Sequence, residues 1–151
     1  MEMNLKTRAL GALAALLSFF TLTGIAAAAD RPYTEGPVVN VSAIRTEPGM
    51  FDAYMTYLAG PYKQAMEAQK AAGVIVSYAV YAAVPRGPED PDVYLITTYK
   101  NMAALDGLSA RLDPIYEKLQ GSMADQNKAY IERGKMRTVL GDELIRQMVL
   151  K

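Results

Sequence analysis

The residues of this sequence that offer chemistry are polar side chains set within apolar strands. We predict that five of them border a ligand cavity, and all five occupy even-numbered strand positions: Asn40, Ser42, Tyr78, Tyr94 and Thr98. Tyrosine hydroxyls and an asparagine amide orient a mostly apolar small molecule through hydrogen bonds. Even positions on different strands share a face only when the pairing register aligns them, so the alternative lining set is Ser77, Tyr81, Thr97 and Tyr99. The competing interpretation is that these tyrosines fill a protein interface.

Three residue types that carry much of enzyme chemistry are missing. The 151 residues contain no histidine, no cysteine and no tryptophan, whereas tyrosine occurs ten times. The absence of histidine and cysteine excludes histidine-based proton transfer and thiol redox chemistry. It also removes the usual protein ligands of zinc and haem, so we predict neither a metal nor a cofactor. Binding without catalysis is favoured. The alternative is a cofactor-independent monooxygenase or isomerase that uses a tyrosine as acid and Asn40 or Arg45 to stabilise an anion.

Two further motifs are interpreted as having no specific function. Asn40-Val41-Ser42 matches a glycosylation sequon, but it lies inside a predicted strand rather than in a loop. Glu89, Asp90 and Asp92 lack the twelve-residue pattern of a calcium loop, and we interpret them as charges that keep a turn solvated.

The first 29 residues have the three parts of a secretory signal. Lys6 and Arg8 precede the apolar run Ala9–Ala29, which ends in small residues just before Asp30. We predict cleavage after Ala29 and export to a periplasm or to the medium. The alternative is an uncleaved anchor, because 21 apolar residues suffice to span a bilayer; that anchor would be the only membrane contact.

The 122 residues that follow the predicted signal suit one domain with one core. Removing Lys6 and Arg8 from the sixteen basic residues, and Glu2 from the sixteen acidic ones, leaves fourteen against fifteen. A nearly neutral chain offers no electrostatic reason to expect nucleic acid or an anionic membrane as a partner.

Prolines and glycines divide this chain into four predicted strands and two helical regions. Gly60-Pro61 is expected to kink the first helical region, and Pro114 to begin a new helical piece in the second. The predicted elements are an extended lead-in at 30–37, a strand at Val38–Thr46, a helix at Phe51–Gln69, strands at Val74–Ala83 and Val93–Tyr99, a helical region from Asn101, a helical insertion at about 121–141, and a strand at Glu143–Leu150.

This order, βαββαβ, predicts an α+β ferredoxin-like fold: a four-stranded antiparallel sheet with its helices on one face. In the strand Val74–Ala83 the side chains that point to either face of the sheet are mostly apolar. The face opposite the helices is therefore expected to be apolar as well. A large exposed apolar face is rare in soluble monomers. We therefore predict that a second copy covers it, which makes a homodimer through the free sheet face.

The pattern resembles the dimeric α+β barrel superfamily, which includes cofactor-free monooxygenases and haem-handling enzymes. The likeness covers about residues 38–108 and is carried by Pro48-Gly49 before the first helix, Gly73 before the second strand, and Tyr99 before Asn101 to Leu105. The segments Thr98–Leu108 and Leu140–Lys151 also resemble small exported proteins of unknown function. The absence of histidine and tryptophan sets this chain apart from the enzymes of that superfamily, so the resemblance implies a fold rather than an activity.

Three functions are consistent with these observations. We favour an exported homodimer that binds a small apolar or aromatic molecule or serves as an assembly module. An enzyme of the cofactor-independent kind is the first alternative. The second is a cell-envelope interaction protein whose partner docks on the tail region 121–141.

Overall fold

The computed structural model describes residues 30–151, of which residues 31–151 form one compact unit. The predicted signal at 1–29 lies outside the described residues. Within those described, no helix is both long enough and apolar enough to cross a membrane. The elements are β1 (Tyr33–Thr46), α1 (Phe51–Tyr57), the π-helix η1 (Leu58–Tyr62), α2 (Lys63–Ala71), β2 (Ser77–Ala82), β3 (Val93–Tyr99), the 3₁₀-helix η2 (Met102–Leu105), α3 (Leu108–Gln120), α4 (Met123–Gly134) and β4 (Arg137–Leu150).

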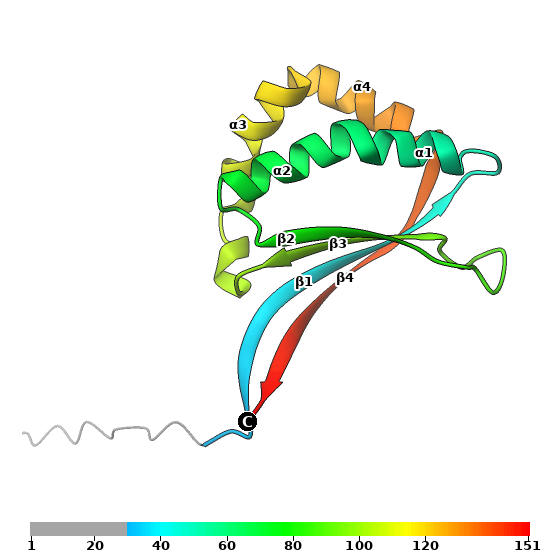
Figure 1. Cartoon of the computed structure of the whole chain (residues 1–151). Helices are drawn as coiled ribbons and strands as arrows, with labels where there is room; N and C mark the ends of the chain where they lie inside the picture. The colour runs from blue at the N-terminus through cyan, green and yellow to red at the C-terminus, as the bar shows by residue number, and fades with distance from the viewer. Residues whose placement is uncertain (1–29) are drawn as a thin grey trace, which may run out of the picture. The chain divides into compact units, whose positions relative to one another are not determined.

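The four strands form one antiparallel sheet in the order β2-β3-β1-β4. The helices α1 to α4, with the π-helix between α1 and α2, lie on one face of this sheet (Figure 1). The predicted α+β ferredoxin-like fold is confirmed, because the chain order places β1 and β3 at the centre and the crossovers bring both helical regions to the same side.

The first and last strands of the chain, β1 and β4, are longer than the sequence pattern indicated. β1 begins at Tyr33, so most of the predicted lead-in is a strand that pairs with β4, and β4 begins at Arg137 rather than at Glu143. The helical tail is correspondingly shorter than the expected insertion. Backbone hydrogen bonds between β1 and β4 extend both strands beyond their apolar segments. The pattern of side chains along the sequence does not reveal such pairing.

The far ends of β1 and β4 form an arm, residues 33–37 and 147–150, that curves away from the helices toward the open side of the sheet (Figure 1). A register shift between Glu35 and Val38 marks the bend, as expected of a β-bulge. Gly36 permits the close approach of the strands, because a Cβ there would lie 3.0 Å from the backbone oxygen of Gln147.

The first helical region is interrupted as predicted at Gly60-Pro61. α1 ends at Tyr57, and the π-helix Leu58–Tyr62 joins it to α2. Proline has no backbone N–H to donate and its ring crowds the preceding turn, so the ladder widens locally instead of continuing as an α-helix. By contrast, Pro114 starts no new helix: α3 begins at Leu108 and runs through it.

Gly73 ends α2 in the conformation expected of it. Its φ of 68° is left-handed, its N–H donates to Lys70 over 3.0 Å, and the Val74 N–H donates to Gln69 over 2.9 Å. These two bonds make a Schellman motif, which satisfies carbonyls at the helix end. The chain then reverses into β2.

The core lies between the helices and the covered face of the sheet. One cluster joins Ile44 and Val93 of the sheet to Tyr54 and Leu58 of the helices, and a second contains Met66, Val74 and Ile75. Ile44, Tyr54 and Val93 are at most 1% exposed. The central strands and the kinked helix therefore contribute the most deeply buried side chains of the described chain.

Candidate functional site

The structure divides the five predicted cavity residues between the two faces of the sheet. Directly paired residues of antiparallel strands project to the same side. Asn40 and Tyr78 both pair with Thr97, and Ser42 alternates with Asn40, so these three lie on the helix-covered face. Tyr94 pairs with Ala43 and Thr98 pairs with Val39, which puts them on the free face. The five side chains therefore do not line one cavity in a single subunit.

The alternative set is divided in the same way, with Ser77 and Tyr81 on the free face and Thr97 and Tyr99 on the covered face. The register, which the sequence did not reveal, offsets the numbering by one residue between neighbouring strands: odd positions of β3 lie beside even positions of β1 and β2. An even-numbered set therefore cannot share a face across all three strands.

The three covered-face residues make local polar contacts. Asn40 Nδ2 donates to Ser42 Oγ over 3.3 Å, and Ser42 in turn donates to the Asp142 carboxylate. The Tyr78 hydroxyl donates to Glu67 on α2 over 2.7 Å. The first two bonds lie within the sheet, and the third joins the sheet to α2. Asn40 of the sequon lies inside the strand β1, as predicted.

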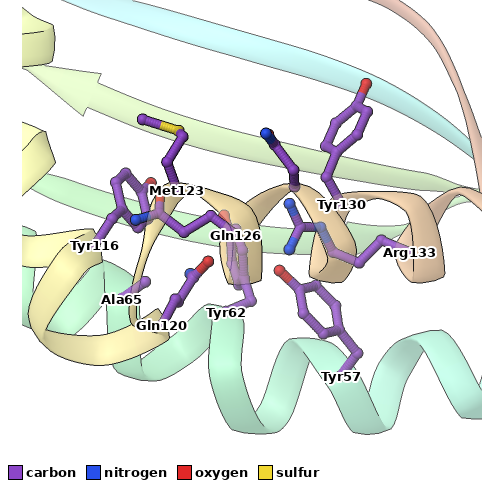
Figure 2. A pocket seen from close by; sticks show the side chains of 10 residues that line it. Tyr57, Tyr62, Ala65, Tyr116, Gln120, Met123, Gln126, Tyr130 and Arg133 are labelled. Carbon is purple, nitrogen blue, oxygen red and sulfur yellow. The ribbon is translucent and has the colours of Figure 1, made fainter.

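A pocket lies within the helix layer, and we call it the tyrosine pocket. It has a volume of about 270 Å³ and is bordered by the α1–η1–α2 segment on one side and by α3 and α4 on the other (Figure 2). That volume is slightly below the ~300–1,000 Å³ typical of ligand pockets, so it suits a small molecule. Its lining residues are Tyr57, Tyr62, Ala65, Tyr116, Gln120, Met123, Gln126, Asn127, Tyr130 and Arg133.

The π-helix positions two of the four tyrosines. Tyr57 is the last residue of α1 and Tyr62 the last residue of the π-helix, on either side of Gly60-Pro61. A π-turn rotates the residues that follow it relative to a continuous α-helix, and such turns are frequent at functional sites. The kink caused by Pro61 thus separates the two rings along the pocket wall.

The opposite wall is α4, whose start is fixed by a capping box. The Ser122 hydroxyl accepts from the Asp125 N–H, and the Asp125 carboxylate accepts from the Ser122 N–H over 3.0 Å. The Ser122 hydroxyl also donates to the Asp125 carboxylate over 2.6 Å. This bond and the one from the Ser122 N–H lower the pKa of Asp125, since they stabilise its ionised form. They orient α4 so that Gln126 and Arg133 face the pocket while Tyr130, which is 61% exposed, stands at its rim.

Tyr62 is the most unusual group in the pocket wall. Its hydroxyl is buried and has no hydrogen-bond partner among the described residues. Burial, helped by the neighbouring tyrosines, raises the pKa of Tyr62 well above its usual range. Its ring meets Tyr78 edge to face, with centroids 6.1 Å apart. An unpaired buried hydroxyl costs about 1–3 kcal/mol, so natural proteins rarely retain one without a role.

Tyr116 contrasts with Tyr62 because its hydroxyl is bonded. Gln69, which is 2% exposed, donates to it from α2 over 3.0 Å. Burial raises the pKa of Tyr116, and the bond from Gln69 opposes that rise. Both phenols are therefore neutral at physiological pH and serve as hydrogen-bonding groups.

Aromatic rings and arginines contact one another from the pocket wall into the neighbouring core, where Tyr54 and Arg137 lie outside the pocket. Tyr54 stacks on Tyr57 with centroids 5.9 Å apart, and the Arg133 guanidinium lies 5.5 Å from both the Tyr57 and Tyr130 ring centroids. Arg137 lies 5.7 Å from the Tyr54 ring. Burial raises the pKa of Tyr54 to about 12, against the opposing effect of the Arg137 cation.

Sequence reasoning did not identify this pocket. Local spacing places Tyr54 and Tyr62 on the apolar stripe of the first helix, and Arg133 among the charges of a solvent-facing helix. The available signal was the Gly60-Pro61 break flanked by Tyr57 and Tyr62. The break forms a pocket wall only because α4 packs against it. The spacing of residues within one segment does not reveal such packing between distant segments.

The acidic loop between β2 and β3 is held by hydrogen bonds and ion pairs. Glu89 pairs with Arg45 at 2.9 Å, the Asp90 carboxylate accepts from the Arg86 N–H over 3.0 Å, and the Asp92 carboxylate accepts from the Thr46 N–H over 2.9 Å. In the described part of the chain, no three potential carboxylate ligands gather around a common point.

The free face of the sheet is apolar and uncovered in the single chain (Figure 1). It has a hollow of about 360 Å³ beside Tyr94, where the pairing of β1 with β4 shifts register a second time, between Ala43 and Ile44. Tyr81 is 56% exposed and Ile145 45% exposed. By register, this face comprises Val39, Val41, Ala43, Ser77, Ala79, Tyr81, Tyr94, Ile96, Thr98, Glu143 and Ile145.

No family model and no curated protein matches this sequence. Solved structures do match its fold. Protein SO0527 from Shewanella oneidensis is similar with a TM-score of 0.50 at 14% identity, over 78% of this chain and 96% of that one. HapK from Hahella chejuensis is similar with a TM-score of 0.48 at 12% identity, over 73% of this chain and 91% of that one.

A third similar structure is a dimeric ferredoxin-like protein from an uncultured marine organism, with a TM-score of 0.48 at 8% identity, over 78% of this chain and 90% of that one. At such identities the likeness concerns the fold alone. The predicted resemblance is therefore confirmed for the fold alone, through SO0527 at a TM-score of 0.50.

Proposed function

We propose that this chain is an exported homodimeric protein that binds a small apolar or aromatic molecule in the tyrosine pocket, without catalysis. The observation that carries the proposal is the combination of an open space of about 270 Å³ with a buried Tyr62 hydroxyl that lacks a partner. Small movements of the wall would bring a ligand oxygen or nitrogen within reach of that hydroxyl, and the bond would recover part of its desolvation cost.

The titration of the tyrosines favours binding over acid catalysis. The pKa values of Tyr62 and Tyr116 are raised by burial, which moves them further from neutral pH. An acid or base works best when its pKa lies near the working pH. These phenols therefore suit hydrogen bonding to a ligand better than proton transfer.

The assembly proposed here is a homodimer through the free sheet face. A second copy would bury the apolar side chains of β1, β2 and β3 that this face exposes, and burial of apolar area is the main driving force of association. The arm of residues 33–37 and 147–150 curves toward the same side and would enclose the partner (Figure 1). The apolar side chains Met148 and Val149 of β4 are 49% and 44% exposed in the single chain.

Sedimentation velocity over a wide concentration range tests this assembly. Ile96→Glu places a charge at the centre of the free face and should convert the dimer to a monomer, because an unpaired carboxylate is costly to bury. Ile131→Glu is the matched control, since Ile131 is 63% exposed on α4, away from the free face. A parent protein that sediments as a monomer at high concentration would contradict the proposal.

Native mass spectrometry of the protein purified from its own host tests ligand binding and processing together. We expect twice the subunit mass plus a retained small molecule, with each subunit starting at Asp30. Phe substitution of Ala65, which lines the pocket and is 3% exposed, fills the space and should remove the retained molecule. Retention of the molecule by a folded Ala65→Phe protein would place it elsewhere, and subunits that keep residues 1–29 would refute cleavage.

A second candidate function is docking of an envelope partner on the tail, and the exposed apolar residues of α4 favour it. Met123, Tyr130 and Ile131 are each more than 60% exposed. In that case the same spectra would contain a second polypeptide, which Ile131→Glu would release without loss of the dimer. Spectra without a second polypeptide would leave α4 as the pocket wall only.

A further inference from the structure

Arg133 is the one charged side chain among the ten residues that line the tyrosine pocket. Four other arginines of the described chain pair with carboxylates or backbone carbonyls: Arg45, Arg86, Arg111 and Arg146. Arg133 forms no ion pair or side-chain hydrogen bond with any described residue, and is held by two rings. Its positive charge is therefore uncompensated inside the helix layer.

The two rings fix the guanidinium without using its donors. Tyr57 and Tyr130 each have their centroid 5.5 Å from the guanidinium carbon, and cation–π contacts of this kind contribute about 0.5–2 kcal/mol. Arginine carries five N–H groups at the edge of its plane. Figure 2 shows the Arg133 side chain reaching from α4 toward the Tyr57 ring. Those edges remain available to an acceptor in the pocket.

The acids near Arg133 are engaged elsewhere. Glu132, its neighbour on α4, receives both of its 2.8 Å hydrogen bonds from Lys135. Among the other lining residues the polar groups are neutral amides and phenols, and Gln126 Nε2 already donates to the Gly121 carbonyl over 3.0 Å. A negative charge for Arg133 must therefore come from outside the described chain.

We infer that the ligand of the tyrosine pocket is a small aromatic carboxylate, with its anion on the Arg133 guanidinium and its ring against the tyrosines. This inference rests on the proposed binding function and names its ligand class. A planar carboxylate fits because it accepts two parallel N–H bonds from one guanidinium, the strongest common pairing of this residue. The tyrosine rings and Met123 supply the apolar surface that an aromatic ring requires.

The test compares two ligands of the same shape by isothermal titration: 2-naphthoate, which is an anion, and 2-naphthamide, which is neutral. A charged hydrogen-bonded pair is worth about 1.5–3 kcal/mol, so the carboxylate should bind about tenfold to a hundredfold more tightly than the amide. Arg133→Gln should abolish this preference, and Arg133→Lys should retain part of it because lysine keeps the charge without the planar fork.

The matched control is Arg86→Gln, which removes the same charge from a side chain that is 92% exposed in the β2–β3 loop and should leave the preference intact. Thermal unfolding of each variant separates a folding defect from a binding defect. Equal affinities of the parent protein for both ligands would overturn the inference but keep the pocket. Absence of binding by both would overturn the proposed function and the inference together.

Discussion

The two faces of the sheet have similar apolar side chains but very different surroundings. Ile44 on the covered face is 1% exposed beneath Tyr54 and Leu58, whereas Ile145 on the free face is 45% exposed with no element of the described chain above it. Right-handed crossovers bring both helical regions to the same side of the sheet, so a single chain covers only one of the two faces. Both faces of the sheet therefore carry the apolar side chains of a buried surface, but the helices of one chain cover only one of them.

The largest expected effect is on the covered face. Ile44→Ala removes three buried carbons from the first core cluster and should lower the free energy of unfolding by about 2–5 kcal/mol, at any protein concentration. Urea denaturation at two concentrations a hundredfold apart measures both the loss and its independence of assembly. A loss that changed with concentration would show that this side of the sheet also takes part in association.

The tyrosines on the helix side predict an alkaline limit to stability. Tyr54 has a pKa of about 12 in the folded protein against an ordinary value of about 10, so the folded state binds more protons between those pH values. Stability is therefore complete below pH 10 and falls as the pH rises through that window, by at most about 1.4 kcal/mol per pH unit for this group.

Urea denaturation at pH 8, 10 and 11 measures this fall. The variant Tyr54→Phe lacks the titrating group and should lose stability less steeply over the same range, whatever its stability at pH 8. Parallel pH profiles for the two proteins would contradict the assignment.

The counterpart of Ile44→Ala on the free face is Ile96→Ala. In dilute solution Ile96 is half-buried, so truncation should cost about 1–2 kcal/mol, less than at Ile44. At high concentration the loss should grow, since association stabilises the folded state by mass action and the variant associates less well. A loss that is the same at both concentrations would mean that a second copy does not cover this face.

The smallest expected effect is at the wall of the tyrosine pocket. Tyr62→Phe removes a buried hydroxyl that has no partner and should leave the ligand-free protein as stable as the parent or about 1 kcal/mol more stable, measured by thermal unfolding. The same change should weaken ligand binding if the hydroxyl bonds the ligand. Destabilisation of the ligand-free protein would show that the hydroxyl is bonded in solution, for example to water.

Features with a strong local cause were predictable. Gly60-Pro61 broke the helix because proline lacks an N–H, and Gly73 ended α2 because glycine tolerates a left-handed φ. The strand Val93–Tyr99 was bounded correctly, because a proline-rich loop precedes its apolar and β-branched run. Pro114 was misjudged, since α3 accommodates it within the helix. Pro114 lies in the second turn of α3, where a proline removes one backbone donor, so the helix continues at the cost of one hydrogen bond.

Composition and periodicity along the chain were enough to predict the order of elements, the ferredoxin-like topology that follows from that order, and the apolar character of both sheet faces. Which residues share a surface depended instead on the folded arrangement. The register divided Asn40 and Tyr78 from Tyr94 and Thr98, and the packing of α4 on the π-helix brought Arg133 to Tyr57 and Tyr62. Both outcomes depend on contacts between distant segments, which local spacing does not specify.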